Sequence, residues 1–327
     1  MAVYTQVPAE TLASFLERYD VGTLRAAKGI AEGVENSNYL VDTSGADGEG
    51  ARFILTLYEK RVREEDLPFF MALLAHLAAR GSPVPRFIPD REGRMLQTLC
   101  DRPAALIEFL TGISVTRPTP AQARSAGHAL GQLHRAAEGF TGQRPNALGP
   151  EGWHGLARDC GASLDEIRPG LAARVQAELA YIDAHWPTDL ERSAIHADLF
   201  PDNVLMVGDE VGGLIDFYFS CTDIRAYDLA ITHGAWCFSP DGHVFHGDVA
   251  AALMAGYARG HGLTRAEHAA LPILARGAAL RFLLTRAYDW INTPPTALVT
   301  RKDPLAYLNR LEAYAGMPPE TLFGRAP

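Results

Sequence analysis

The stretch of residues 195–220, IHADLFPDNVLMVGDEVGGLIDFYFS, constrains this chain more than any other part of its sequence. Asp198 directly follows a β-like run, Asn203 lies five positions later in the same turn, and Asp216 ends the next β-like run. A hairpin brings the start of its first strand close to the end of its second. The pattern therefore predicts that these three side chains converge on one point.

The chemistry of these three side chains indicates a phosphate site. One carboxylate and one amide supply oxygen ligands of the kind that Mg²⁺ prefers, and Mg²⁺ fills its remaining positions with waters and phosphate oxygens. A further carboxylate can accept a proton from a hydroxyl group. Together these are the parts that phosphoryl transfer from ATP requires. The competing interpretation is two capped turns joined by a salt bridge, which is purely structural.

The composition argues against several other classes of protein. Of the 327 residues, 47% are hydrophobic and 21% are charged, which is typical of neither a disordered chain nor a membrane protein. The net charge of -9 argues against long-range attraction to nucleic acid or to anionic lipid. The four cysteines lack the spacing of a disulfide scaffold or a zinc site. Because no signal peptide or membrane span is evident, we expect a cytoplasmic protein.

Two regions of different pattern predict an α+β protein. The first part combines an opening helix, short β-rich runs such as Tyr39–Asp42 and Phe53–Tyr58, and one further amphipathic helix. From about Pro118 the patterns are mostly helical, and a threonine cap precedes the first of these helices. A helix interruption is expected near Pro169. The sequence does not indicate an oligomeric state.

Several motifs resemble those of the aminoglycoside-phosphotransferase-like kinases, which are relatives of the protein kinases. HADLFPDNVL followed by GLIDF resembles their H-x-D-x-x-x-x-N and I-D-F/W motifs. KGIAEGVENSNYLV resembles their glycine-containing first hairpin, ALIEFLTG their hinge, and GHALGQLHRA their G-x-x-L-G-x-L-H helix. The motifs cover most of the chain in family order. The resemblance implies a protein-kinase-like bilobal fold, with a small nucleotide-binding sheet-plus-helix lobe in residues 1–110. Residues 111–327 would form a larger, mainly helical lobe for catalysis and acceptor binding.

Within this family, further segments are similar to the homoserine kinases, among them ENSNYLVDT, FILTLYEKR and the terminal RKDPLAYL. This similarity implies a kinase that uses ATP and Mg²⁺ to phosphorylate the side-chain hydroxyl of L-homoserine, on the way to threonine. Two alternatives stay open. One is a kinase of the same fold with an aminoglycoside, methylthioribose, choline or sugar-amine acceptor, and the other is a pseudokinase that binds nucleotide without turnover.

The resemblance also implies roles for the residues of the opening stretch. Asp198 would act as the catalytic base or orient the acceptor hydroxyl, and His196 would support the catalytic turn. Asn203 and Asp216 would hold Mg²⁺. Asp228 would brace the catalytic loop.

The nucleotide would be bound by backbone and side-chain groups of the first lobe. The family commonly has a lysine or arginine on its third strand, but Thr56 occupies that position here. A different cation must then neutralise the triphosphate, and Lys60, Arg52 and Lys28 are candidates, with Glu65 as the helix acid. The nucleotide-binding residues that we expect are Gly29, Gly33, Asn38, Lys60, Glu65, Glu108 and Leu110.

An amino-acid acceptor requires partners for a carboxylate and an ammonium group. The helical pattern RFLLTRAYDW offers Arg281, Arg286 and Asp289, of which Arg281 and Asp289 are eight positions apart and so lie about two turns apart on a shared face. Tyr218, Asp223 and Trp236 follow Asp216 and could line the same pocket. The alternative for Arg281 and Asp289 is a surface ion pair.

Overall fold

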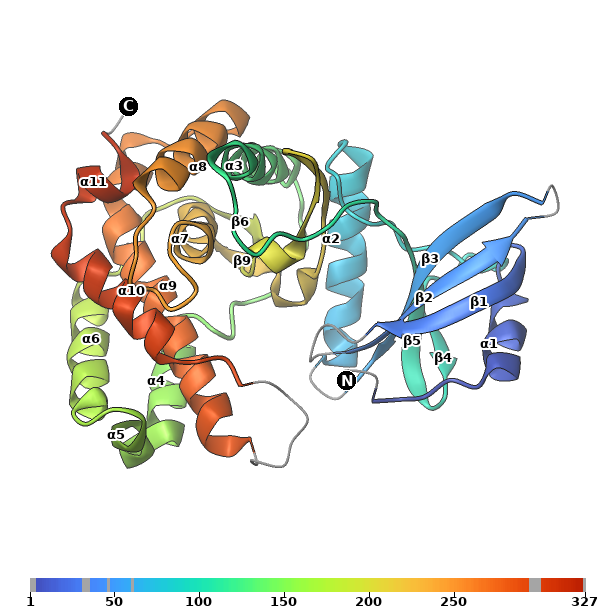
Figure 1. Ribbon diagram of the computed structural model, residues 1–327, viewed down its shortest axis with the longest axis horizontal. Coiled ribbons are helices and arrows are strands. Elements are labelled where there is room, and N and C mark those ends of the chain that lie inside the picture. Colours follow the sequence, from blue (N-terminus) through green and yellow to red (C-terminus); the bar gives the residue numbers. More distant parts are fainter. Residues whose placement is uncertain (1–3, 31–35, 46–47, 60–61, 294–300, 326–327) are drawn as a thin grey trace. The chain divides into compact units, whose positions relative to one another are not determined.

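A computed structural model describes residues 4–30, 36–45, 48–59, 62–293 and 301–325 of the chain (Figure 1). The chain divides into two compact units, residues 1–111 and residues 112–327. The first unit is built on an antiparallel sheet and the second is mainly helical, which confirms the predicted α+β class.

The first unit holds a five-stranded antiparallel sheet in the order β1-β2-β3-β5-β4. The predicted runs Tyr39–Asp42 and Phe53–Tyr58 lie within its second and third strands. The strands are β1 Thr23–Ile30, β2 Asn36–Ser44, β3 Gly50–Tyr58, β4 Gln97–Leu99 and β5 Arg102–Glu108, and the helices are α1 Ala9–Leu16 and α2 Leu67–Ala79, which a 3₁₀ turn at Glu64–Asp66 precedes.

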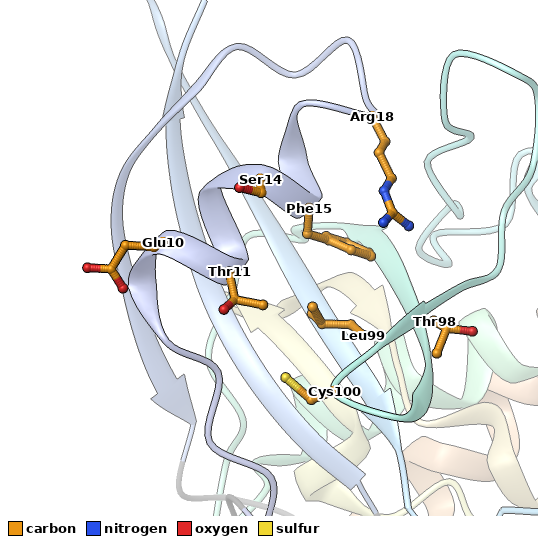
Figure 2. A pocket seen from close by; sticks show the side chains of 8 residues that line it. All are labelled: Glu10, Thr11, Ser14, Phe15, Arg18, Thr98, Leu99 and Cys100. Carbon is orange, nitrogen blue, oxygen red and sulfur yellow. The ribbon is translucent and has the colours of Figure 1, made fainter.

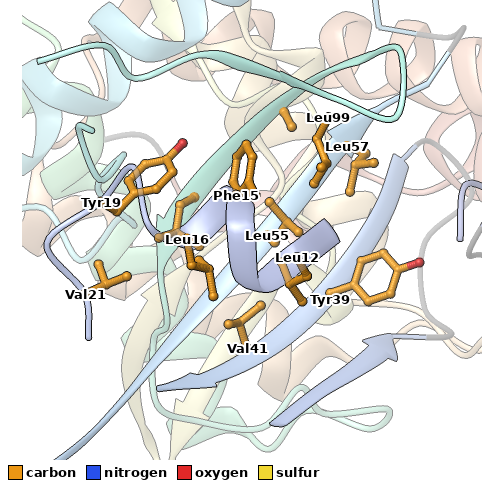
Figure 3. Close-up of a cluster of buried hydrophobic side chains, with 12 residues drawn as sticks. Leu12, Phe15, Leu16, Tyr19, Val21, Tyr39, Val41, Leu55, Leu57 and Leu99 are labelled. Atoms are coloured by element: carbon orange, nitrogen blue, oxygen red, sulfur yellow. The ribbon is translucent and has the colours of Figure 1, made fainter. Parts of the chain in front are cut away.

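The core of the first unit forms where α1 packs on the sheet (Figure 3). Leu12, Phe15 and Leu16 repeat at helical spacing, so they line one side of α1 and bury almost all of their surface. Val41 and Leu55 face them from neighbouring strands and are fully buried. Because strand side chains alternate between the two faces, these strands offer one apolar face to α1.

The second unit is a set of helices with two small antiparallel strand pairs. The helix expected to be interrupted near Pro169 is indeed two helices, because α5 ends at Ile167 and α6 begins at Leu171. The helices are α3 Pro120–Ala136, α4 Pro150–Cys160, α5 Leu164–Ile167, α6 Leu171–His185, α7 Arg225–Trp236, α8 Gly247–Gly260, α9 Arg265–Asn292, α10 Leu305–Gly316 and α11 Pro319–Phe323. Within the residues described, no helix is long and apolar enough to cross a bilayer.

The opening stretch contains more strands than the two β-like runs that the sequence indicates. The second run pairs with a strand between the two runs, as β7 Val204–Val207 and β8 Glu210–Leu214. The first run is β6 Arg192–Ile195, which pairs instead with β9 Cys221–Ile224. The β7–β8 hairpin places Asn203, before its first strand, near Asp216, after its second. Asp198 reaches the same region from the end of β6.

Glycines let α3 and α8 pack with their backbones in close contact. Thr119 begins α3 with the cap that the sequence predicts, since its Oγ1 accepts a hydrogen bond from the Gln122 backbone N–H. A Cβ atom on Gly256 would lie 2.0 Å from the Arg124 carbonyl oxygen, and one on Gly127 would lie 2.1 Å from the Leu253 carbonyl oxygen. Side chains at these positions would therefore force the two helices apart.

We predict that Gly256→Ala destabilises the chain by about 1–3 kcal/mol, because the added methyl group overlaps backbone atoms of α3. Gly316→Ala is the matched control, since Gly316 also lies in a helix and a Cβ there meets nothing within 4 Å. In the control, higher helix propensity should give about 0.5–1 kcal/mol of stabilisation. Urea unfolding measures both changes, and equal effects of the two substitutions would contradict the packing account.

Candidate functional site

The turn after β6 is held in an uncommon backbone conformation. Ala197 has a φ of 63°, which a residue with a Cβ seldom adopts. Its backbone N–H donates to Asp228 Oδ1 over 2.8 Å, and the preceding His196 N–H donates to Asp228 Oδ2 over 2.7 Å. On the other side, Arg281 Nη1 donates to the Ala197 carbonyl oxygen over 2.6 Å. The turn that carries Asp198 is thus fixed from both sides by buried charged groups.

Asp228 lies in the first turn of α7 and is completely buried. Burial favours the neutral acid, but hydrogen bonds from His134 and the His196 backbone hold the pKa of Asp228 below its ordinary value. His134 Nε2 donates to Asp228 Oδ2 over 3.0 Å, and its Nδ1 accepts from the Tyr257 hydroxyl over 2.8 Å. Burial lowers the pKa of His134, so it serves as a neutral support.

His196 connects the catalytic turn to the segment that carries Asp216. Its Nε2 donates to the Ile215 carbonyl oxygen over 3.0 Å, and its Nδ1 accepts the Asp198 N–H over 3.2 Å. These bonds require the neutral imidazole, because a protonated ring has no acceptor nitrogen. Burial lowers the pKa of His196 and so favours that form. The supporting role expected for His196 agrees with these contacts.

Asn203 is fixed to Asp198 by its amide group. Its Nδ2 donates to the Asp198 carbonyl oxygen over 2.8 Å and lies 3.3 Å from Asp198 Oδ2. The Asn203 carbonyl oxygen accepts the Ile215 N–H over 3.0 Å. Asp216 follows Ile215 directly, in a left-handed conformation with a φ of 64°. Both hydrogen-bonding groups of Ile215 are therefore bound by residues of the turn, so the structure brings the three predicted side chains to one region.

The Asp198 carboxyl group is half-buried beside several charges. Burial raises its pKa to about 8. The negative charge of Asp216 adds to this rise, whereas the positive charges of Arg281 and Lys302 oppose it. The hydrogen bonds of Ile215 to His196 and Asn203 place Asp216, the next residue, beside the turn that carries Asp198. Carboxylates in a partly buried site favour the binding of a cation.

The donor set fits Mg²⁺ on the chemistry of its side chains. Since Nδ2 of Asn203 is used by Asp198, the other amide atom, Oδ1, is the one that can face a cation. That oxygen and the Asp216 carboxylate are hard oxygen ligands, as Mg²⁺ requires. Over the described ranges, no cluster of three or more histidine, cysteine, aspartate and glutamate residues could hold a metal alone. A cation at this site would therefore need waters or phosphate oxygens to complete its coordination.

Neutral side chains fill the strand position where the family usually has a basic residue. Thr56 on β3 is opposite Asn38 on β2, and its Oγ1 donates to Asn38 Oδ1 over 2.8 Å. Gly29 lies on β1, paired with Tyr39. The remaining members of the predicted phosphate-binding set, Gly33 and Lys60, lie outside the described residues.

The other predicted nucleotide contacts have varied surroundings. Arg52 is exposed and forms an ion pair with Asp42 over 3.0 Å, and Lys28 is exposed on β1. Glu65 is exposed and forms an ion pair with Arg63 over 3.2 Å. Glu108 ends β5, and Leu110 follows it; both are half-buried. The identity of the triphosphate cation stays a prediction.

The structure gives three of the predicted acceptor-binding residues partners within the fold. Trp236 is buried and its Nε1 donates to the Leu199 carbonyl oxygen over 3.0 Å. The buried Asp223 carboxylate accepts from Asn146 Nδ2 over 2.7 Å and lies 3.2 Å from Arg192 Nη2. Like Arg281, these residues also support the turn or its neighbouring strands, and a contact of any of them with an acceptor stays a prediction.

The two other predicted acceptor residues lie closer to the surface. Tyr218 is half-buried two positions after Asp216, and Asp289 is half-buried on α9. A contact of either residue with an acceptor stays a prediction. The ion pair between Arg281 and Asp289 that we considered is not among the ion pairs formed by the residues that the structure describes.

A separate surface pocket of about 460 Å³ lies in the first unit, between α1 and the β4–β5 turn (Figure 2). Phe15 and Arg18 contribute from α1 and its following residues, and Leu99 and Cys100 from the turn. None of the predicted site residues lines this pocket. The candidate site is therefore defined by the polar residues around Asp198 rather than by this pocket.

Comparisons with known proteins agree with this arrangement. The model of the phosphotransferase enzyme family matches residues 26–263. Similar curated relatives include the homoserine kinase of Methylobacterium radiotolerans, 55% identical over 95% of both chains. Another is that of Zymomonas mobilis subsp. mobilis, 53% identical over 96% of this chain and 97% of the relative.

Solved structures of small-molecule kinases share the fold. The amicoumacin kinase hAmiN in complex with AMP-PNP, Ca²⁺ and Ami has a TM-score of 0.72, with 15% identity over 96% of this chain and 95% of that one. The spectinomycin phosphotransferase APH(9)-Ia in complex with ADP and spectinomycin has a TM-score of 0.73, with 15% identity over 97% of this chain and all of that one. At such identities the likeness concerns the fold.

We predict that the chain loses stability as the pH falls from about 6.5 towards 4, because it buries neutral histidines. His134, His196 and His233 all have a lowered pKa, and burial lowers that of His233 from 6.5 to about 4. Within this window the unfolded chain binds protons that the folded chain does not, so the free energy of unfolding falls with pH. For His233 alone the full loss is about 3 kcal/mol.

Urea unfolding at several pH values tests this dependence. His233→Gln should flatten the curve between pH 6.5 and 4, whereas His185→Gln, at an exposed position of α6, should leave its slope unchanged. His233 binds Tyr314 and Leu322, away from the catalytic turn, so its replacement leaves that turn intact. A His233→Gln curve parallel to that of the unaltered chain would contradict the assignment.

Proposed function

The chain belongs to the phosphotransferase enzyme family, and from this membership we propose that it is a homoserine kinase, which transfers the γ-phosphate of ATP to the side-chain hydroxyl of L-homoserine. Curated homoserine kinases are 50–55% identical to it over 95–98% of their own length. The observation that carries the mechanism is the turn that holds Asp198 and Asn203 beside Asp216. The place of the reaction in threonine synthesis follows from its product.

In the proposed reaction, Asp198 orients the homoserine hydroxyl towards the γ-phosphorus of ATP. The hydroxyl oxygen forms a bond to that phosphorus as the bond to the β,γ-bridging oxygen breaks, and ADP leaves with the electron pair of that bond. The hydroxyl proton passes to Asp198 in its carboxylate form, which the positive charges of Arg281 and Lys302 favour. The products are ADP and the phosphate ester of homoserine. Such transfers depend mainly on positioning and electrostatics, which suits a turn fixed from both sides.

Asn203 Oδ1 and the Asp216 carboxylate would hold Mg²⁺ in this scheme. When bound, Mg²⁺ would neutralise charge that develops on the β- and γ-phosphate oxygens. His196 helps to hold Asn203 and Asp216 near each other, because its hydrogen bond joins the turn to the carbonyl oxygen of Ile215. We assign nucleotide binding to residues 1–110, and among the residues that the structure describes we expect Gly29, Asn38, Glu108 and Leu110 to contact the nucleotide.

A nucleotide-binding protein without turnover is the second candidate, and Thr56 is the observation that favours it. The Thr56–Asn38 hydrogen bond leaves the usual basic position neutral. The supported Asp198 argues the other way, since binding alone does not require a carboxylate placed against an acceptor hydroxyl. We therefore prefer the enzyme.

We predict that ATP and Mg²⁺ support rapid ADP formation with L-homoserine, and little with an aminocyclitol, choline or methylthioribose. Coupled ADP-release assays across this acceptor panel measure the preference. Asp198→Ala tests the mechanism. It should lower turnover by about 10³-fold or more while the affinity for nucleotide stays within a few-fold. Turnover with an aminocyclitol but not with homoserine would overturn the acceptor, and full activity of Asp198→Ala would remove Asp198 from the mechanism.

A further inference from the structure

Arg286, on α9, holds its guanidinium group in a defined place within the second unit. The group lies over the ring of Tyr307, 4.6 Å from its centroid. Its Nη1 donates to the Asp303 carbonyl oxygen over 3.2 Å. The side chain is half-buried, and Tyr307 beneath it is fully buried. A flat cation between an aromatic ring and a carbonyl oxygen has little rotational freedom, so its free N–H groups point in fixed directions.

Ring contacts through Tyr307 and then Phe200 link this guanidinium to the catalytic turn. The Tyr307 ring lies 5.0 Å from the Phe282 ring and 6.3 Å from the Phe200 ring, and Phe200 lies 4.9 Å from Phe282, all between centroids. Phe200 in turn belongs to the turn, because its N–H donates to the Asp198 carbonyl oxygen over 2.8 Å. Asp198 is also among the charges that act on Arg286.

No carboxylate among the described residues lies within ion-pair distance of Arg286. The nearby Asp303 carboxylate accepts the Leu305 N–H at the start of α10. Burial lowers the pKa of Arg286 and the charge of Arg310 lowers it further, whereas the charges of Asp198 and Asp303 oppose this change. Such a group is a ready partner for an anionic ligand.

The other cations near Asp198 are less suited to that task. Arg281 is only 1% exposed, and its Nη1 is used by the Ala197 carbonyl oxygen. The Lys302 side chain is 63% exposed, and its Nζ lies 3.7 Å from Asp202 Oδ2. Arg286 combines partial exposure, a fixed orientation and the absence of an acid partner in the described structure.

We propose that Arg286 binds the α-carboxylate of the acceptor and thereby selects an amino acid over a simple amino alcohol. This inference rests on the proposed homoserine kinase function. The guanidinium can form two parallel hydrogen bonds with a carboxylate, which fixes the direction of the acceptor as well as its affinity. The hydroxyl end of the acceptor would then lie towards Asp198. The role expected of Arg281 passes to Arg286.

The test compares two acceptors that differ only in the carboxylate, L-homoserine and 3-aminopropan-1-ol. Arg286→Gln should raise the KM for homoserine by about 30-fold or more, leave the KM for ATP unchanged, and change kcat/KM for 3-aminopropan-1-ol by less than about threefold. Arg286→Lys keeps the charge but loses the paired geometry, so its homoserine KM should rise by about tenfold.

Arg301→Gln is the matched control. Its guanidinium also lies over a ring, 4.5 Å from the Trp290 centroid, and its Nη1 also donates to a carbonyl oxygen, that of Trp290, over 3.0 Å. The control should keep the preference of the unaltered chain for homoserine. Circular dichroism and thermal unfolding establish that each variant is folded, and Arg286→Lys keeps the test available if Arg286→Gln does not fold.

Several results would overturn the inference. Equal losses with both acceptors would mean that Arg286 does not read the carboxylate, and a raised KM for ATP would mean that its charge serves the triphosphate. An unchanged preference in Arg286→Gln would also exclude the role. Each of these leaves the proposed function standing, provided that the unaltered chain phosphorylates homoserine. An unaltered chain that is inactive on homoserine would instead overturn the function and this inference together.

Discussion

The buried Asp228 carboxylate is the interaction on which the rest of the site depends. Its two oxygens accept two consecutive backbone N–H groups, those of His196 and Ala197. A left-handed Ala197 costs roughly 1–2 kcal/mol of backbone strain. Two hydrogen bonds to a charged acceptor contribute about 1.5–3 kcal/mol each, so the bracing outweighs the strain. The conformation that exposes Asp198 is therefore stable because a charge on α7 holds it.

The neutral side chain of His134 donates a hydrogen bond to the Asp228 carboxylate and so favours its charged form. His134 reaches Asp228 from α3, and the hydroxyl of Tyr257 on α8 fixes the orientation of the ring. The close packing of α3 against α8, which glycines permit, places these two residues within hydrogen-bonding distance. Helix packing and the geometry of the turn are thus parts of one arrangement. His196 and Asn203, both in the turn, form hydrogen bonds with the backbone of Ile215. These bonds fix the position of Asp216, the next residue.

The sequence was most informative about functional residues that lie close together along the chain. The sequence predicted that Asp198, Asn203 and Asp216 converge through one hairpin of the two β-like runs, whereas β6 pairs with β9 and β8 pairs with β7, so the three residues reach one region by a different topology. The sequence did not reveal β1 as a full strand, because most of its residues are exposed and lack alternating apolar residues. It also did not distinguish Arg281 from Arg286. Both are arginines on one helix, and only the packing of α9 buries the first under Ala197 and leaves the second half-exposed over Tyr307.

We infer that Asp228 makes phosphoryl transfer fast by holding the turn, and single-turnover kinetics of Asp228→Asn with excess enzyme and radiolabelled ATP tests this inference most directly. An asparagine can accept one of the two N–H groups and presents its own N–H groups to the other. The account predicts that transfer slows by about 100-fold or more while the folded chain binds nucleotide with nearly unchanged affinity. A folded variant that transfers phosphate at the original rate would contradict it.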